Sequence, residues 1–134
     1  MGAAALAVAL MRSTGSPGEA PATTARYTPE ESTAAHRKLC DAYSLASRAV
    51  QIETNGTSPE RAGIAEINGA MMLDDAVNGA AGLSPSDRAA AVALARAYTN
   101  LAAVASLNDN LKWQPALNDA NAKDAVMQKV CNGG

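Results

Sequence analysis

The stretch from residue 28 to residue 53 constrains the fold most, because its apolar side chains return at alternating intervals of three and four residues. This spacing places them on one face of an α-helix. Thr28 can cap the helix, Pro29 suits its first position, and Glu31 can complete a capping box. The apolar face comprises His36, Leu39, Tyr43, Ala46 and Val50. We therefore expect a long amphipathic helix against which the rest of the chain packs.

The chain beyond this helix carries two more starts in which a hydroxyl residue precedes proline, Ser58-Pro59 and Ser84-Pro85. With a last helix beginning at Pro115, the expected spans are 58–79, 84–107 and 115–130. The short links between these spans favour antiparallel neighbours. Phe is absent and no strictly alternating apolar segment is present, which argues against strands. The sequence predicts an all-α fold, an antiparallel up-down-up-down four-helix bundle over residues 28–134.

Each later helix has its own expected inward face. The second has Ile64, Ile67 and Met71 on one side and Ala70, Leu73 and Val77 beside them, so we expect it to be the most buried. The third carries the regular series Ala91, Leu94, Tyr98, Leu101 and Ala105. The last presents Leu117, Ala120, Asp124 and Met127.

Residues 1–27 are expected to form a separate segment. Residues 3–11 are apolar, but they are too few to span a bilayer, which needs roughly 20 residues. We interpret them as the remnant of a membrane anchor, with a cleaved signal peptide and an alanine-rich tail as the alternatives. The Ser, Thr, Pro and Ala residues that follow predict a disordered linker.

The two cysteines, Cys40 and Cys131, lie on the first and last helices, which are neighbours in an up-down bundle. We expect them to form one disulfide if the compartment is oxidising. Two free buried thiols are one alternative. A metal site that adds His36 and either Asp41 or Asp124 is another, but such a site lacks the usual ligand spacing.

His36 is the only histidine, and it lies on the inward face of the first helix. Counting along antiparallel helices brings it level with Asp74, so a polar pair of His36 with Asp74 is one hypothesis. The simpler interpretation is a half-solvated histidine at the open end of the bundle. Asp124 presents a similar question, and its possible partners are Tyr43, Tyr98 and Arg48.

Several functions are disfavoured by what the sequence lacks. The net charge of −2 and the interleaved charges provide no basic face for nucleic acid. A single histidine without a Gly-x-Ser-x-Gly turn or a glycine-rich phosphate loop does not fit the common catalytic patterns. We expect no enzymatic activity, no catalytic residue, no metal and no cofactor.

The chain resembles the small alanine-rich extracytoplasmic domains of uncharacterised actinobacterial, especially mycobacterial, membrane proteins. The resemblance rests on the linker 13–25 and on the segments Tyr27-Thr28-Pro29-Glu30-Glu31, Leu39-Cys40-Asp41-Ala42-Tyr43 and 121–131. It implies an extracytoplasmic location and paired cysteines, and it brings no activity with it.

These features lead to two functional hypotheses. The first is a non-enzymatic domain, tethered to the cell membrane through its N-terminal segment, that acts outside the cytoplasm by contact with an envelope protein. The alternative is a carrier that holds a lipid or haem-like apolar ligand between its helices. Its expected cleft residues are Tyr43, Met71, Tyr98, Trp113 and Met127.

Overall fold

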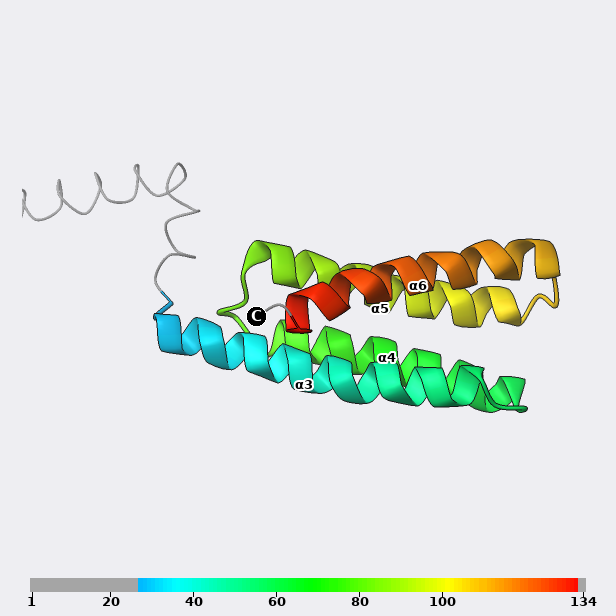
Figure 1. The fold of residues 1–134 in the computed structure, drawn as a ribbon, viewed down its shortest axis with the longest axis horizontal. Helices are drawn as coiled ribbons and strands as arrows, with labels where there is room; N and C mark the ends of the chain where they lie inside the picture. Colours follow the sequence, from blue (N-terminus) through cyan, green and yellow to red (C-terminus); the bar gives the residue numbers. More distant parts are fainter. Residues whose placement is uncertain (1–26, 133–134) are drawn as a thin grey trace, which may run out of the picture.

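The computed structural model describes residues 27–132, which form four α-helices joined by short turns. The helices are α3 (Pro29–Thr54), α4 (Pro59–Asn78), α5 (Pro85–Ala105) and α6 (Asn110–Asn132). Consecutive helices run antiparallel and pack along their lengths, which confirms the up-down four-helix bundle (Figure 1). The predicted N-terminal anchor and most of the linker lie outside the described residues.

The first three helices begin where the hydroxyl-proline pairs predict. Thr28 accepts a hydrogen bond from the backbone N–H of Glu31 at 3.1 Å, and the Glu31 carboxylate accepts one from the backbone N–H of Thr28. This reciprocal pair is the expected capping box. Ser58 and Ser84 cap α4 and α5 in the same way, each through its side-chain oxygen.

The start of α6 differs from the prediction, because the helix begins at Asn110 and not at Pro115. Asn108 adopts a left-handed backbone conformation with φ of 52°, which asparagine tolerates better than most residues. Asp109 then caps the helix, accepting a hydrogen bond from the backbone N–H of Leu111 at 3.0 Å. Pro115 consequently lies inside the helix, in its second turn.

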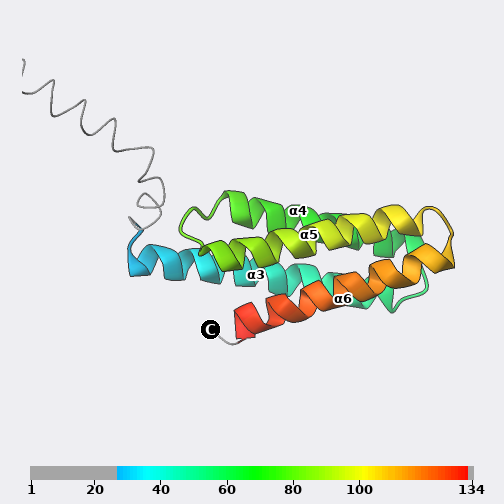
Figure 2. The ribbon, with the colours of Figure 1, turned by 90° about the horizontal axis from the view of Figure 1, so that it is seen from above.

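The packing between the helices is uneven. In Figure 1, α3 and α4 form one layer, and α5 and α6 form the other. Figure 2 shows the same bundle from above, with α5 lying between α4 and α6. The pairs α3–α4, α4–α5 and α5–α6 share long interfaces, whereas α3 and α6 approach each other over a much smaller area. The bundle is therefore weakly closed by packing along its α3–α6 side.

The core is built from leucine and alanine, with few aromatic side chains. Its largest fully buried side chains are Leu39, Leu73, Leu94, Leu101 and Met127. Small residues let the helices approach closely, and Gly69 of α4 illustrates this. A Cβ atom added at Gly69 would lie 3.2 Å from Cε2 of Tyr98 and 3.5 Å from Cβ of Ala46.

The inward face of α4 also differs from the prediction. Ile64, Ile67 and Met71 are 60%, 39% and 58% exposed, so α4 is not the most buried helix in the way expected. Its buried face instead carries smaller residues around one leucine: Ala65, Glu66, Gly69, Ala70, Leu73, Ala76 and Val77. Close helix approach favours small side chains on this face, and it leaves the bulky ones outside.

None of the helices between residues 27 and 132 has the length and hydropathy required to cross a bilayer.

Candidate functional site

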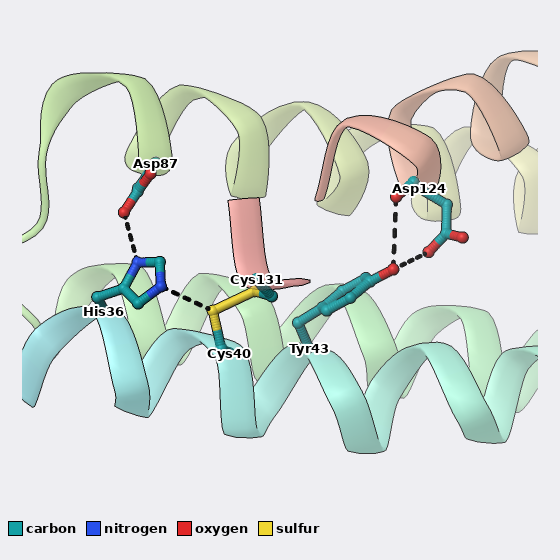
Figure 3. Close-up of a disulfide and its surroundings, with 6 residues drawn as sticks. All are labelled: His36, Cys40, Tyr43, Asp87, Asp124 and Cys131. Carbon is teal, nitrogen blue, oxygen red and sulfur yellow. Dashed lines mark hydrogen bonds and ion pairs between the residues drawn. A yellow bond between two sulfur atoms is a disulfide. The ribbon is translucent and has the colours of Figure 1, made fainter. Parts of the chain in front are cut away.

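Cys40 and Cys131 form a disulfide that joins α3 to the end of α6 (Figure 3). Their Cα atoms lie 5.4 Å apart, a typical separation for bridged cysteines. The predicted pairing is confirmed, and the alternatives of free thiols or a thiolate-bound metal are not realised. Among residues 27–132, no group of three or more His, Cys, Asp or Glu side chains is placed to hold a metal ion.

His36 pairs with Asp87, and its predicted pairing with Asp74 is wrong. Nδ1 of His36 lies 2.9 Å from Oδ2 of Asp87 in the first turn of α5, and Nε2 lies 3.6 Å from Sγ of Cys40 (Figure 3). Asp74 follows the fully buried Leu73 directly, so the helical rotation turns its side chain to solvent. Counting along the helices from the turn did not give the register of α3 against α4, in which Lys38 lies near Gly79, and could not fix the direction in which Asp74 points.

Asp124 of α6 is bound by Tyr43 of α3, one of the partners expected for it. The Tyr43 hydroxyl donates to Oδ1 of Asp124 at 2.7 Å (Figure 3). The Gln128 side chain donates to Oδ2 of Asp124 at 2.8 Å. Burial raises the pKa of the Tyr43 phenol well above its ordinary value, and the hydrogen bond to Asp124 adds to this effect. The phenol is therefore a neutral donor, and it supports the disulfide on the sparsely packed α3–α6 side.

The structure does not bring the expected apolar cleft together. Tyr43, Tyr98 and Met127 are buried in the core, whereas Met71 is exposed on the outer side of α4. Trp113 is half-buried near the start of α6, where it lines a cavity next to the α3–α4 and α5–α6 turns. The predicted ligand-binding set is therefore divided among the core, the surface and one end of the bundle.

Glu66 was not singled out from the sequence, yet its environment is the most unusual among the described residues. The side chain lies on the inward face of α4, and the residue is only 3% exposed. Burial raises the pKa of its carboxyl group from the ordinary 4.5 to about 7. Its spacing of seven residues before the buried Leu73 was the available signal, because two turns of a helix return a side chain to nearly the same face.

A cavity of about 340 Å³ adjoins Glu66 at the end of the bundle formed by the α3–α4 and α5–α6 turns. It opens to solvent, and its walls combine the polar turn residues with Ala62, Val104 and Trp113. Its volume falls within the range of sites for small molecules. A buried carboxyl group beside a cavity is a feature found at many functional sites.

Large apolar side chains also gather on the outer surface of the α3–α4 layer. We call this surface the α3–α4 apolar face, and it comprises Leu45, Ile52, Ile64, Ile67 and Met71, all exposed. Leu45 and Ile64 line one groove, between α3 and α4. Ile64 and Ile67 line a second groove of about 890 Å³ between α4 and α5. Ile64 borders both grooves, so the two grooves meet along α4.

Comparison with known proteins adds no assignment to these features. No protein-family model matches the chain, and no curated protein or solved structure matches it.

Proposed function

We propose that this protein is a non-enzymatic interaction module of the cell envelope, tethered to the membrane through its N-terminal segment, with the bundle outside the cytoplasm. The observation that carries the proposal is the α3–α4 apolar face. Ile64, Ile67 and Met71 are separated by three and four residues, so they form one stripe along α4. Contiguous exposed apolar side chains on a small domain mark a surface that another molecule covers.

The shape of the face favours an amphipathic helix of a partner protein. The groove between α4 and α5 follows two antiparallel helices, and small residues line it beside the isoleucines, among them Gly63, Ala102 and Ala103. A helix that places an apolar side chain at every third or fourth position fits such a groove. Near this face, Nε of Arg61 on α4 donates to Oε2 of Glu53 on α3 at 2.7 Å, so the charge of Arg61 is already compensated. Apolar contact should therefore dominate the interaction.

The location proposed for the bundle is supported by the disulfide. Disulfides persist in oxidising compartments and are rare in reducing ones. Cys40 and Cys131 account for every cysteine in the chain, so no free thiol remains. The resemblance to extracytoplasmic domains of actinobacterial membrane proteins points to the same location.

Site-specific photo-crosslinking in intact cells tests the proposed contact. A photoreactive amino acid at Ile64 should give one discrete adduct with a different protein, and Ile67→Glu should abolish that adduct. The matched control position is Leu111, which is 88% exposed on α6 and lies outside the apolar face.

The outcomes separate the possible occupants of the face. An adduct at Ile64 and none at Leu111 supports the proposal, provided that the Ile67→Glu chain retains the melting temperature of the parent. Equal labelling at both positions, or none at Ile64, contradicts it. An adduct of twice the chain mass would replace the partner protein with a second copy of this chain.

A further inference from the structure

The Glu66 carboxyl group is buried without compensation from the protein. Among residues 27–132, no side chain or backbone donor hydrogen-bonds to it, and no cation forms an ion pair with it. In the described part of the chain, every fully enclosed side-chain oxygen has a hydrogen-bond partner. Because the Glu66 oxygens have no partner, they are not fully enclosed in the core. The carboxyl group therefore borders the cavity, and anything that enters the cavity can meet it.

An unpaired buried carboxylate is costly, and proteins normally compensate one with a cation or hydrogen-bond donors. The basic residue on the same helix, Arg61, cannot do so here, because its guanidinium group binds both oxygens of Glu53 at 2.7 and 2.9 Å. No lysine or arginine lines the cavity among the described residues. The compensating cation is thus missing from the described part of the protein.

The rest of the cavity also suits a cation better than an anion. Glu53 and Asp109 contribute further carboxylates to its lining, although Glu53 is paired with Arg61. Ala62 and Val104 provide apolar surface, and Trp113 provides an aromatic ring. An indole ring attracts a cation placed over its face and also accommodates an apolar group. No lysine or arginine side chain among the described lining residues could act as counter-ion to an anion here.

We propose that this cavity binds a small organic cation, an ammonium group on a short apolar body, with Glu66 as its counter-ion and Trp113 as part of its wall. The cavity volume of about 340 Å³ accommodates an amine of this size. The site lies at the end of the bundle that carries the α3–α4 and α5–α6 turns, and both turns can be followed in Figures 1 and 2. It involves neither the disulfide nor the contact function proposed above.

Binding should strengthen as the pH rises from 6 to 8. With its pKa raised to about 7, Glu66 changes from mostly protonated to mostly ionised over this interval, which predicts an affinity gain of about tenfold. The other ionisable groups around it are Glu53 with Arg61, Asp109, and Tyr98 on α5. Burial raises the pKa of the Tyr98 phenol, so this group stays neutral throughout the interval.

Trp113 makes the test simple, because it is the only tryptophan in the chain and it lines the cavity. Phenethylammonium is the probe, and 2-phenylethanol is its neutral counterpart. Titration of the full chain at pH 8, followed by tryptophan fluorescence, should give saturable binding with a Kd on the order of 1 mM for the amine. Glu66→Gln should weaken that binding at least about tenfold, because the counter-ion is lost.

Glu60→Gln is the matched control, since it removes an exposed carboxylate from the first turn of the same helix. Its affinity for the amine should equal that of the parent chain. Equal binding of the amine to the Glu66→Gln chain, equal binding of the alcohol to the parent, or no saturation by about 10 mM amine would overturn the proposal. Circular dichroism of both variants verifies that each remains helical.

Discussion

The carboxyl group of Glu66 occupies a position where the neighbouring turns of α4 carry alanine, glycine or leucine. Removing a carboxylate from water favours its protonated form, and this is why its pKa rises to about 7. The sequence contains twelve other Asp and Glu residues. The spacing of seven residues places Glu66 on the same face of α4 as Leu73, but only packing shows that this face is the buried one. A single charged residue among small ones does not indicate whether its side chain turns inward.

Folding stability should depend on pH through Glu66. Between pH 4.5 and 7, Glu66 keeps its proton in the folded state but releases it in the unfolded state. The stability that this difference in protonation contributes is therefore complete below pH 4.5 and is lost as the pH rises through 7. Glu66→Gln stays neutral and should therefore be more stable than the parent above pH 8, by about 3 kcal/mol. Near pH 4, the two should be nearly equal.

Urea denaturation of the two chains from pH 4 to pH 9 measures this difference, and taking the difference cancels the titration of all other groups. Glu60→Gln shows whether losing any carboxylate from α4 has the same effect. A Glu66→Gln difference that does not change with pH would show that Glu66 is as well solvated when folded as when unfolded.

At the scale of single helices, local and tertiary effects were not equally predictable. The starts of α3, α4 and α5 each depend on a hydroxyl cap followed directly by a proline, so the sequence predicts them directly. The buried face of α4 depends on how closely the helix approaches its neighbours. Periodicity alone favoured the bulky Ile64, Ile67 and Met71, but close approach requires the small side chains of the other face.

The two glycines within α4 provide a direct test of this close approach. Alanine favours a helix over glycine by about 1 kcal/mol, so Gly63→Ala should stabilise the protein by up to that amount, because the added Cβ would meet no atom within 4 Å outside its own stretch of helix. Gly69→Ala gains the same preference but places its Cβ 3.2 Å from the ring of Tyr98. Tyr98 is buried and has little room to move, so we expect a net loss of about 1 kcal/mol.

Thermal or urea unfolding of the two variants gives the comparison, with each substitution serving as the control for the other. Stabilisation by both alanines would mean that α4 and α5 can separate at little cost. The close packing at Gly69 would then not be what selects the buried face of α4.

At the scale of the whole molecule, the pairing of Cys40 with Cys131 was predictable because it follows from topology. In an up-down bundle the first and last helices are neighbours, and each carries one of the two cysteines. Topology could not predict that the α3–α6 interface would be the sparsest of the four. That depends on tertiary packing, and α6 buries only Ala116, Ala120 and Met127.

Removing the disulfide should therefore affect α6 most. The loop between the cysteines spans 91 residues, and the chain-entropy estimate for its closure is about 4 to 5 kcal/mol of stability. Replacing both Cys40 and Cys131 with alanine should lower the free energy of unfolding by an amount of that order, measured by urea denaturation. Amide hydrogen exchange should accelerate in α6 before it does in α4 or α5.

Treating the parent chain with an alkylating agent in the absence of reductant is the control, and it should change neither measurement. Uniform acceleration of exchange over all four helices would indicate that α6 is held as firmly as the others by packing alone. The disulfide would then stabilise the bundle as a whole, with no special role on its open side.

The position of this bond along the chain has a consequence for biosynthesis. Cys131 is the second-to-last residue of α6, so the ribosome has produced nearly the entire bundle before Cys40 can find its partner. Closure must then follow the synthesis of Cys131 and await an electron acceptor. Until that oxidation occurs, a newly made molecule holds its last helix by non-covalent contacts alone, and the supply of oxidant sets the moment at which the fold is locked.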